Sequence, residues 1–218
     1  MGKLYLNNYN KNQFKNVYFI TGTATGGKTT ISKELIKKYG WIRYDVDEKF
    51  ETHKKLSNSI NQPNMNKTFK NADEFFMRNQ DEYIDWLKNN SKEQLPFILN
   101  DLIELSKKQK VVCDLHLLVD EAEQIANYNQ IIFLIRENND NIIDDYCNRP
   151  SHTGFNNFIN SATNPTLAKK NCNDVLRRIN EEKCHAIKNS KFAYIERNSN
   201  STIENTLYQV EKHFGLIK

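Results

Sequence analysis

The sequence predicts a single α/β domain, residues 1–218, in which parallel strands are covered by helices, and three observations support this expectation. A chain of 218 residues fits one such domain with insertions, because it can bury most of its apolar surface in one core. Near-continuous apolar runs, such as residues 131–135, are typical of parallel strands buried on both faces. Segments of helical periodicity separate these runs, as an α/β fold requires.

The first predicted unit is a strand, a glycine-rich turn and a helix in direct succession. Residues 17–20 are β-branched and aromatic, and Thr21-Gly22 stop the run abruptly. The next helix has one apolar face and is expected to end at Gly40. That face is formed by Ile31, Leu35 and Tyr39. Residues 1–16 are polar and predict a loose arm or a short leading strand.

Residues 41–44 predict a second strand, and a long helical stretch follows it. Asn71 and Glu74 have the spacing of a capping box. One helix is expected after this box, with Phe76, Tyr83 and Leu87, and another with Ile98, Leu102 and Leu105. Because the stretch is longer than a strand crossover needs, we interpret residues 51–110 as a helical insertion that covers a substrate.

Three further strands are predicted over residues 111–114, 131–135 and 192–195. Residues 151–173 are polar and rich in asparagine, which favours a mobile loop. The last helix begins with a capping-box pattern, Ser201 and Glu204, and Gly215 follows it. Its apolar face is formed by Ile203, Leu207, Val210 and Phe214.

Composition narrows the class of protein without identifying a ligand. The chain has no apolar run of membrane-spanning length and no apolar core of a secretory signal, so we expect a cytoplasmic protein with no membrane partner. Its cysteines form no C-x-x-C pair, which favours reduced thiols. A net charge of +4 fits a small anionic ligand as well as a nucleic acid. Monomer and homodimer both remain open.

The strongest motif is the turn between the first strand and the first helix, which satisfies G-x-x-x-x-G-K-[ST]. Glycines let backbone N–H groups curl around an anion, and the helix dipole adds positive charge there. We therefore predict that the segment binds MgATP, with Lys28 on the β and γ phosphates and Thr29 on Mg²⁺. A chance match in a glycine turn is the alternative. The predicted ATP-binding residues are Gly22, Thr23, Ala24, Thr25, Gly26, Gly27, Lys28, Thr29 and Thr30.

Three aspartates follow predicted strands and are expected at the same edge of the sheet. Asp45 and Asp47 follow the second strand, and Asp114 ends the third. A carboxylate there can hold Mg²⁺ or accept the proton of an attacking hydroxyl. We therefore predict Asp45 and Asp114 as metal ligands beside Thr29, and Asp45 and Asp47 as catalytic candidates. The alternative for each is a helix cap or a polar strand end.

Arginines gather between the fourth and fifth predicted strands, and this favours a lid over residues 137–178. Guanidinium groups there would stabilise the charge of a γ-phosphate and exclude water. Surface salt bridges are the alternative for each arginine. The set consists of Arg136, Arg149, Arg177 and Arg178, of which Arg149 and Arg178 are the preferred pair.

Taken together, these residues resemble the P-loop small-molecule kinases of the nucleoside monophosphate kinase and shikimate kinase type. Besides residues 22–29, the resemblance rests on Asp45-Val-Asp47-Glu-Lys-Phe-Glu51, Glu74, Arg78, Asn148-Arg149-Pro150 and Arg178. It implies a five-stranded parallel sheet of order 2-3-1-4-5 with helices on both faces. It also implies MgATP as donor, Asp47 near the acceptor hydroxyl, Arg78 as an acceptor contact, and lid arginines that close on ATP. Where shikimate kinases have a glycine-rich substrate turn, this chain has Asp114-Leu115-His116, and Asp114 is a further acceptor-binding candidate.

The sequence therefore predicts a kinase that transfers the γ-phosphoryl group of MgATP to a hydroxyl or phosphate of a small-molecule acceptor. No N-K-x-D motif is present, which argues against a GTPase switch. Two alternatives stay open. One is a nucleic-acid end kinase, although a nucleic acid is a less favoured partner than a small molecule, and the other is a non-catalytic regulatory protein that binds nucleotide. The sequence leaves the acceptor unspecified.

Overall fold

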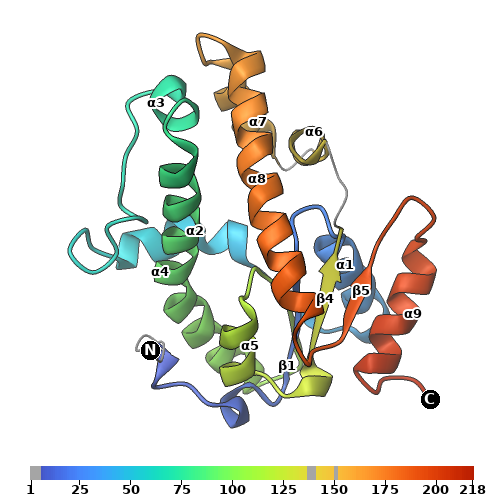
Figure 1. Cartoon of the computed structure of the whole chain (residues 1–218). Helices are drawn as coiled ribbons and strands as arrows, with labels where there is room; N and C mark the ends of the chain where they lie inside the picture. Colours follow the sequence, from blue (N-terminus) through green and yellow to red (C-terminus); the bar gives the residue numbers. More distant parts are fainter. Residues whose placement is uncertain (1–5, 137–140, 150–151) are drawn as a thin grey trace.

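The computed structural model describes residues 6–136, 141–149 and 152–218, and its centre is one parallel sheet (Figure 1). The five strands lie in the order β2-β3-β1-β4-β5, which confirms the predicted fold class and strand order. They are β1 (Val17–Gly22), β2 (Ile42–Asp45), β3 (Val111–Asp114), β4 (Ile131–Ile135) and β5 (Tyr194–Glu196).

Helices cover both faces of this sheet because the apolar residues of the central strands point alternately to either side. In β1, Phe19 faces one layer and Ile20 the other. The Ile20 face is covered by α1 (Lys28–Tyr39) and α9 (Ile203–His213). The opposite face is covered by α4 (Gln80–Ser106), α5 (Val119–Ile125) and α8 (Pro165–Lys188).

A second hydrophobic cluster lies beyond the carboxyl ends of the strands. It is formed by α3 (Ala72–Phe76), α6 (Ile142–Cys147), α7 (Thr153–Asn160) and the adjoining parts of α4 and α8. At 24 residues, α8 is about 36 Å long. Its first half packs in this cluster through Cys172 and Val175, and its second half packs against the sheet through Cys184 and Ile187. The helix thus connects the predicted lid to the sheet (Figure 1).

The structure corrects the predicted helical insertion. The two helices expected after the capping box are one continuous helix, α4, which has 27 residues and contains Pro96. Asn71 caps the separate short helix α3, and Glu74 accepts from the amide of Lys70 instead of closing the box on Asn71. The insertion begins with α2 (Val46–Leu56).

Two segments that were expected to be loose are ordered. Residues 151–173 contain α7 and the start of α8, because Phe155, Phe158 and Ile159 pack into the second cluster and Pro165 begins α8. Of the predicted arm, residues 1–5 lie outside the described residues. The rest packs on the core through Leu6 and Phe14, and it includes the short helix η2 (Lys11–Phe14).

Smaller corrections concern element ends. The strand expected over residues 192–195 is β5, which begins at Tyr194, and Thr202 rather than Ser201 caps α9. The short helix η3 (Tyr128–Gln130) precedes β4. The four cysteines are buried and form no disulfide among the described residues.

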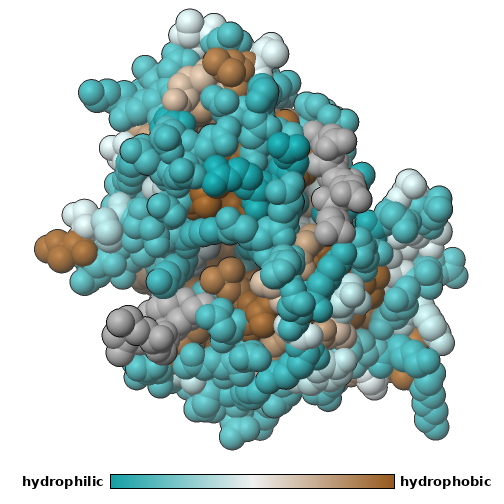
Figure 2. Space-filling view, in the orientation of Figure 1, coloured by the Kyte–Doolittle hydropathy of each residue, from teal (hydrophilic) through white to brown (hydrophobic). Residues whose placement is uncertain are grey.

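The surface is hydrophilic over most of the face shown in Figure 2, and a hollow near its centre exposes hydrophobic side chains. Among the described residues, no helix is both long enough and apolar enough to cross a membrane.

Candidate active site

The turn between β1 and α1 has the backbone shape of an anion-binding loop. Gly22 and Gly27 have φ angles of 122° and 91°, and Thr25 has a φ of 57°. Gly27 is the N-cap residue of α1 and has no side chain to accept a hydrogen bond. The first N–H groups of the helix therefore face the loop uncapped by a side chain. The loop and the helix dipole together concentrate positive potential at this point.

Backbone contacts from β4 hold the loop in this shape. The Thr23 amide donates to the Leu134 carbonyl at 3.1 Å, and the Arg136 amide donates to Thr23 Oγ1 at 2.9 Å. A Cβ on Gly22 would lie 2.1 Å from the Leu134 oxygen, so the loop crosses β4 at a distance that only glycine permits. The sequence around residues 22–29 therefore dictates both the turn and its contact with the next strand.

Lys28 folds back over the loop and lacks a carboxylate partner. Its Nζ donates to the Thr23 carbonyl at 2.6 Å. Burial, reinforced by the nearby Lys183 ammonium, lowers the pKa of Lys28 to about 7. Among the described residues, no Asp or Glu forms an ion pair with this ammonium, although Asp114 and Asp47 act on it from further away. A bound polyanion would supply the missing negative charge.

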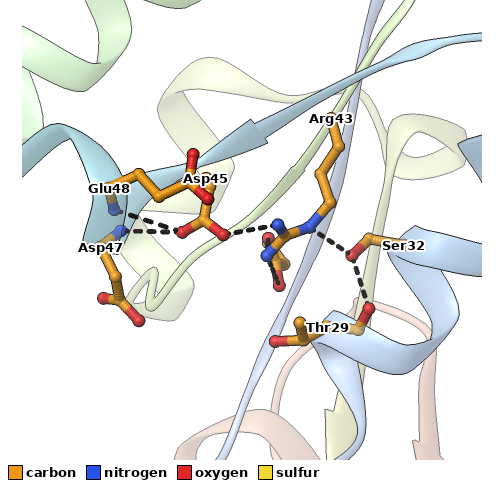
Figure 3. Close-up of polar contacts among 7 residues, drawn as sticks. Thr29, Ser32, Arg43, Asp45, Asp47 and Glu48 are labelled. Atoms are coloured by element: carbon orange, nitrogen blue, oxygen red, sulfur yellow. Dashed lines mark hydrogen bonds and ion pairs between the residues drawn. The ribbon is translucent and has the colours of Figure 1, made fainter. Parts of the chain in front are cut away.

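Arg43, which the motif analysis did not select, joins the two predicted metal ligands (Figure 3). Its Nη1 pairs with Asp45 Oδ2, and its Nη2 lies 3.2 Å from both carboxylate oxygens of Asp114. Its Nε donates to Ser32 Oγ at 3.2 Å, and Ser32 Oγ donates to the Thr29 carbonyl at 3.0 Å. Because Asp45 and Asp114 are register partners in β2 and β3, their charges lie side by side, and Arg43 offsets them in part.

Asp45 also caps α2, the alternative that the sequence left open. Its Oδ1 accepts from the amides of Asp47 and Glu48 at 3.1 Å and 3.4 Å. Both oxygens of Asp45 are therefore occupied, one by the helix and one by Arg43. The roles of Asp45 as metal ligand and catalytic residue stay predictions. So do the roles of Asp114 as metal ligand and acceptor contact.

Asp47 differs from the other two aspartates because its carboxylate turns away from the Arg43 contacts (Figure 3). None of the described residues donates a hydrogen bond to it. Burial raises the pKa of Asp47, the charges of Asp45 and Asp114 raise it further, and His152 and Lys28 oppose the shift. A carboxylate of raised pKa without a donor is suited to accept a proton.

One arginine of the predicted lid acts on the Lys28 region. The positive charge of Arg149 lowers the pKa of Lys28, and its guanidinium lies 5.7 Å from the Tyr146 ring centre. Tyr146 stacks on His152 with a centroid separation of 3.8 Å. Burial, together with the Asp47 charge, raises the pKa of Tyr146 to about 12. Arg149, Tyr146 and His152 therefore approach Lys28 and Asp47 from the lid side.

The other lid arginines have partners elsewhere. Arg178 donates to Asp81 at 2.8 Å across α8 and α4, and Arg136 donates to Asp145 at 2.9 Å. Arg177 lies 4.0 Å from carboxylates of its own helix. The closure of Arg178 on ATP stays a prediction. Residues 137–140 of the predicted lid, and Pro150 of its Asn-Arg-Pro motif, lie outside the described residues.

Arg78, the predicted acceptor contact, lies within an aromatic cage in this structure. Its guanidinium carbon is 4.0–4.7 Å from the centres of four rings, and its three nitrogens are buried with no hydrogen-bond partner among the described residues. The rings supply cation–π attraction in place of hydrogen bonds. They are Phe69, Phe75, Tyr83 and Trp86. The acceptor role of Arg78 stays a prediction.

Two further contacts to the loop come from residues that carry no motif. Asn180 of α8 accepts from the Ala24 amide at 2.9 Å. Arg197, just after β5, has its Nη1 3.5 Å from the Gly26 carbonyl and fills the space beside Gly27. A lone Asn or Arg far along the chain gives no sequence signal for such a contact, and only the fold brings it to the loop.

Comparison with known proteins shows similarity to solved structures but to no family model. No protein-family model matches the sequence, and no curated protein is significantly similar to it. Among solved structures, the chain is similar to a deoxyadenosine kinase from M. mycoides with the products dCMP and a flexible dCDP bound. The match has a TM-score of 0.43 and 13% sequence identity, and it covers 92% of this chain and 100% of that chain.

The Arg43 contacts generate a stability prediction. Replacing Arg43 with Met leaves two neighbouring carboxylates without their cation, so we expect a loss of about 3 kcal/mol in the free energy of unfolding. Urea denaturation measures this loss. Asp45→Asn and Asp114→Asn added to Arg43→Met should recover part of it, because they remove the uncompensated charges. An Arg43→Met variant as stable as the wild type would contradict this assignment.

Proposed function

We propose that the chain is an ATP-dependent phosphotransferase that passes the γ-phosphoryl group of ATP to a hydroxyl or phosphate of a small-molecule acceptor. One observation carries the proposal: a loop with left-handed residues holds a partly buried Lys28 that no described carboxylate pairs with. Nearby lies a carboxylate, Asp47, that accepts no hydrogen bond from the described residues. The loop suits a polyphosphate and the carboxylate suits proton acceptance, which are the two requirements of phosphoryl transfer to a hydroxyl.

The residues present fit a donor in the form of MgATP. The amides of residues 22–29 would surround the phosphates, with Lys28 against the β and γ groups. Mg²⁺ takes few protein ligands when phosphates and water complete its shell, so the Thr29 hydroxyl with one nearby carboxylate is a sufficient protein contribution. When bound, the ion would neutralise phosphate charge. Asp45 and Asp114 are the candidate carboxylates, and each would have to share its charge with Arg43.

Asp47 is the residue best suited to accept the acceptor's proton. A raised pKa makes a carboxylate a better base than an aspartate of ordinary pKa. On the lid side, Arg149 is the arginine best placed to stabilise negative charge that develops on the transferred group. Within the proposal, α2 thus carries the base, the loop carries the donor and α6 with its following residues closes the site.

The acceptor class is the finer part of the proposal, and the resemblance to nucleoside monophosphate and shikimate kinases supports a small polar molecule. A nucleic-acid end kinase and a regulatory nucleotide-binding protein are the competing functions. A screen of ADP release against nucleosides, nucleotides, sugar acids, shikimate and oligonucleotide ends separates all three. Release stimulated by a small molecule supports the proposal, whereas stimulation only by oligonucleotides, or by nothing, rejects it.

Lys28→Met should abolish turnover and stabilise the fold. Loss of the ammonium removes on the order of 3 kcal/mol of transition-state stabilisation, which lowers kcat by roughly a hundredfold or more. The same change removes a buried charge and should add about 1 kcal/mol to the free energy of unfolding. Because the pKa of Lys28 is about 7 in the folded chain and 10.5 in the reference state, this gain is greatest below pH 7 and disappears as the pH approaches 10.5.

Steady-state ADP release and thermal denaturation at several pH values measure the two effects of Lys28→Met. Wild-type turnover in the variant would remove Lys28 from the chemistry. A melting temperature that falls at every pH would show that Lys28 stabilises the fold instead.

Asp47→Asn should impair transfer far more than ATP binding. The amide cannot accept the proton, so kcat should fall roughly a hundredfold to ten-thousandfold. The Kd for MgATP should change only a few-fold, because the phosphates are bound mainly by the loop. Glu104→Gln is a matched control, since its carboxyl group is exposed and pairs with Lys107. Equal losses of kcat and MgATP affinity would assign Asp47 to the metal instead.

A further inference from the structure

The face of α8 that lies against the P-loop carries two polar residues, Asn180 and Lys183. These positions are three apart, which places them on one side of the helix. Asn180 is buried, and its side chain bonds both backbone groups of Ala24: it accepts from the amide at 2.9 Å and donates to the carbonyl at 3.4 Å. This side of α8 is therefore held against the loop itself, and Lys183 belongs to the same contact.

Lys183 is held in an arrangement that leaves one polar group unsatisfied. Its Nζ lies 3.3 Å from His116 Nδ1, and the same ring nitrogen lies 3.1 Å from the Gly22 carbonyl oxygen. If Nδ1 carries a proton for Gly22, it offers no acceptor to the Lys183 ammonium. If Nδ1 is unprotonated, it accepts from Lys183, but two acceptors, Nδ1 and the Gly22 oxygen, then face each other. A neutral imidazole nitrogen cannot satisfy a carbonyl and an ammonium together.

The charges around this point lack a matching anion. Lys28 and Lys183 both lower the pKa of His116 well below its usual range, which keeps that ring neutral. Burial lowers the pKa of Lys183 to about 8; Glu121 opposes this shift and Lys88 adds to it. Among the described residues, no carboxylate forms an ion pair with either Lys28 or Lys183. The loop thus has two partly buried amines beside it, one from α1 and one from α8.

We propose that Lys183 is a second cationic contact for the phosphate chain that binds at the loop of residues 22–29. The proposal rests on the proposed function, because it assigns a further residue to the same donor site. While the His116 ring nitrogen donates to the Gly22 carbonyl, it cannot accept from Lys183. A phosphate oxygen would give the Lys183 ammonium an acceptor in its place. The long, flexible stem of lysine allows the ammonium to turn from the ring nitrogen to such an oxygen.

This assignment also gives α8 a role in the site. The helix joins the cluster of α3, α6 and α7 to the sheet, so a phosphate contact through Lys183 would connect the bound donor to the element that supports the predicted lid. Arg178, which the sequence favoured for this helix, instead donates to Asp81 of α4. Lys183, about one and a half turns beyond Arg178, instead contacts His116, which in turn contacts Gly22 of the loop.

The test is calorimetric titration of the full chain with inorganic tripolyphosphate and, separately, with MgATP. The variants are Lys183→Met, Lys183→Arg and the control Lys170→Met, which removes an exposed lysine of the same helix that pairs with Asp174. We expect Lys183→Met to weaken binding of both ligands at least tenfold, Lys183→Arg to restore part of the affinity, and Lys170→Met to bind like the wild type.

The outcomes separate this inference from the proposed function. If the wild type binds both ligands and Lys183→Met binds them equally well, the role of Lys183 is overturned and the proposed function stands. If the wild type binds neither ligand, both fall. If Lys183→Met fails to fold, the side-chain carbon resonances of Lys183 in labelled wild type give the answer: a shift on addition of tripolyphosphate supports the contact, and an unchanged signal rejects it.

Discussion

The left-handed turn that leads from β1 into α1 determines where every other group of the candidate site must lie. Its shape depends on Gly22 passing directly over the Leu134 carbonyl and on Thr23 bonding to β4 from both its amide and its hydroxyl. Thr25 adopts a positive φ, a conformation that is unfavourable for a β-branched residue and persists only when its surroundings enforce it. The chain thus holds local strain and a partly buried Lys28 of lowered pKa at one point. A bound anion would favour the charged form of Lys28.

The three aspartates beside this turn differ in their contacts: two are paired with an arginine, and the third is not. Asp45 and Asp114 sit opposite each other in β2 and β3, and Arg43 pairs with both. Asp47, two residues further on, is left without such a partner. Asp47 lies on α2, and the buried His53 of this helix contacts α4. The ring nitrogens Nε2 and Nδ1 of His53 lie 3.1 Å from Asp101 Oδ2 and 3.1 Å from Gln94 Nε2. The free carboxylate therefore stands on a well-anchored element.

The parts of the fold that the sequence predicted are those with local signals. Apolar runs identified the buried strands, and the glycine pattern identified the turn at residues 22–29. The strand order came from the resemblance to a kinase family. Residues 151–173 were misassigned because their asparagines outweighed the aromatic residues Phe155 and Phe158, which are spaced three apart on one helix face. The sequence predicted two helices where α4 is continuous, and Pro96 lies inside that helix although proline usually ends or kinks one.

In the candidate site, too, the sequence predicted only the residues that belong to a local motif. Lys28 and Asp47 belong to a local motif, whereas Arg43, Asn180, Lys183 and Arg197 reach the site from separate elements without one. Arg43 offered a weak signal, since two-residue alternation puts it on the same side of β2 as Asp45. No comparable signal marks the others, because their roles depend on the distance between α8, β5 and the loop.

The most direct test of the account is a titration of the wild-type chain with MgATP at pH 8 in buffers that differ in ionisation enthalpy. With a pKa of about 7, Lys28 is mostly neutral at this pH in the free protein, and a bound polyphosphate should restore its charge. The account predicts saturable binding accompanied by uptake of about one proton, seen as a heat that changes with the buffer. An absence of saturable heat, or a binding heat identical in every buffer, would contradict it.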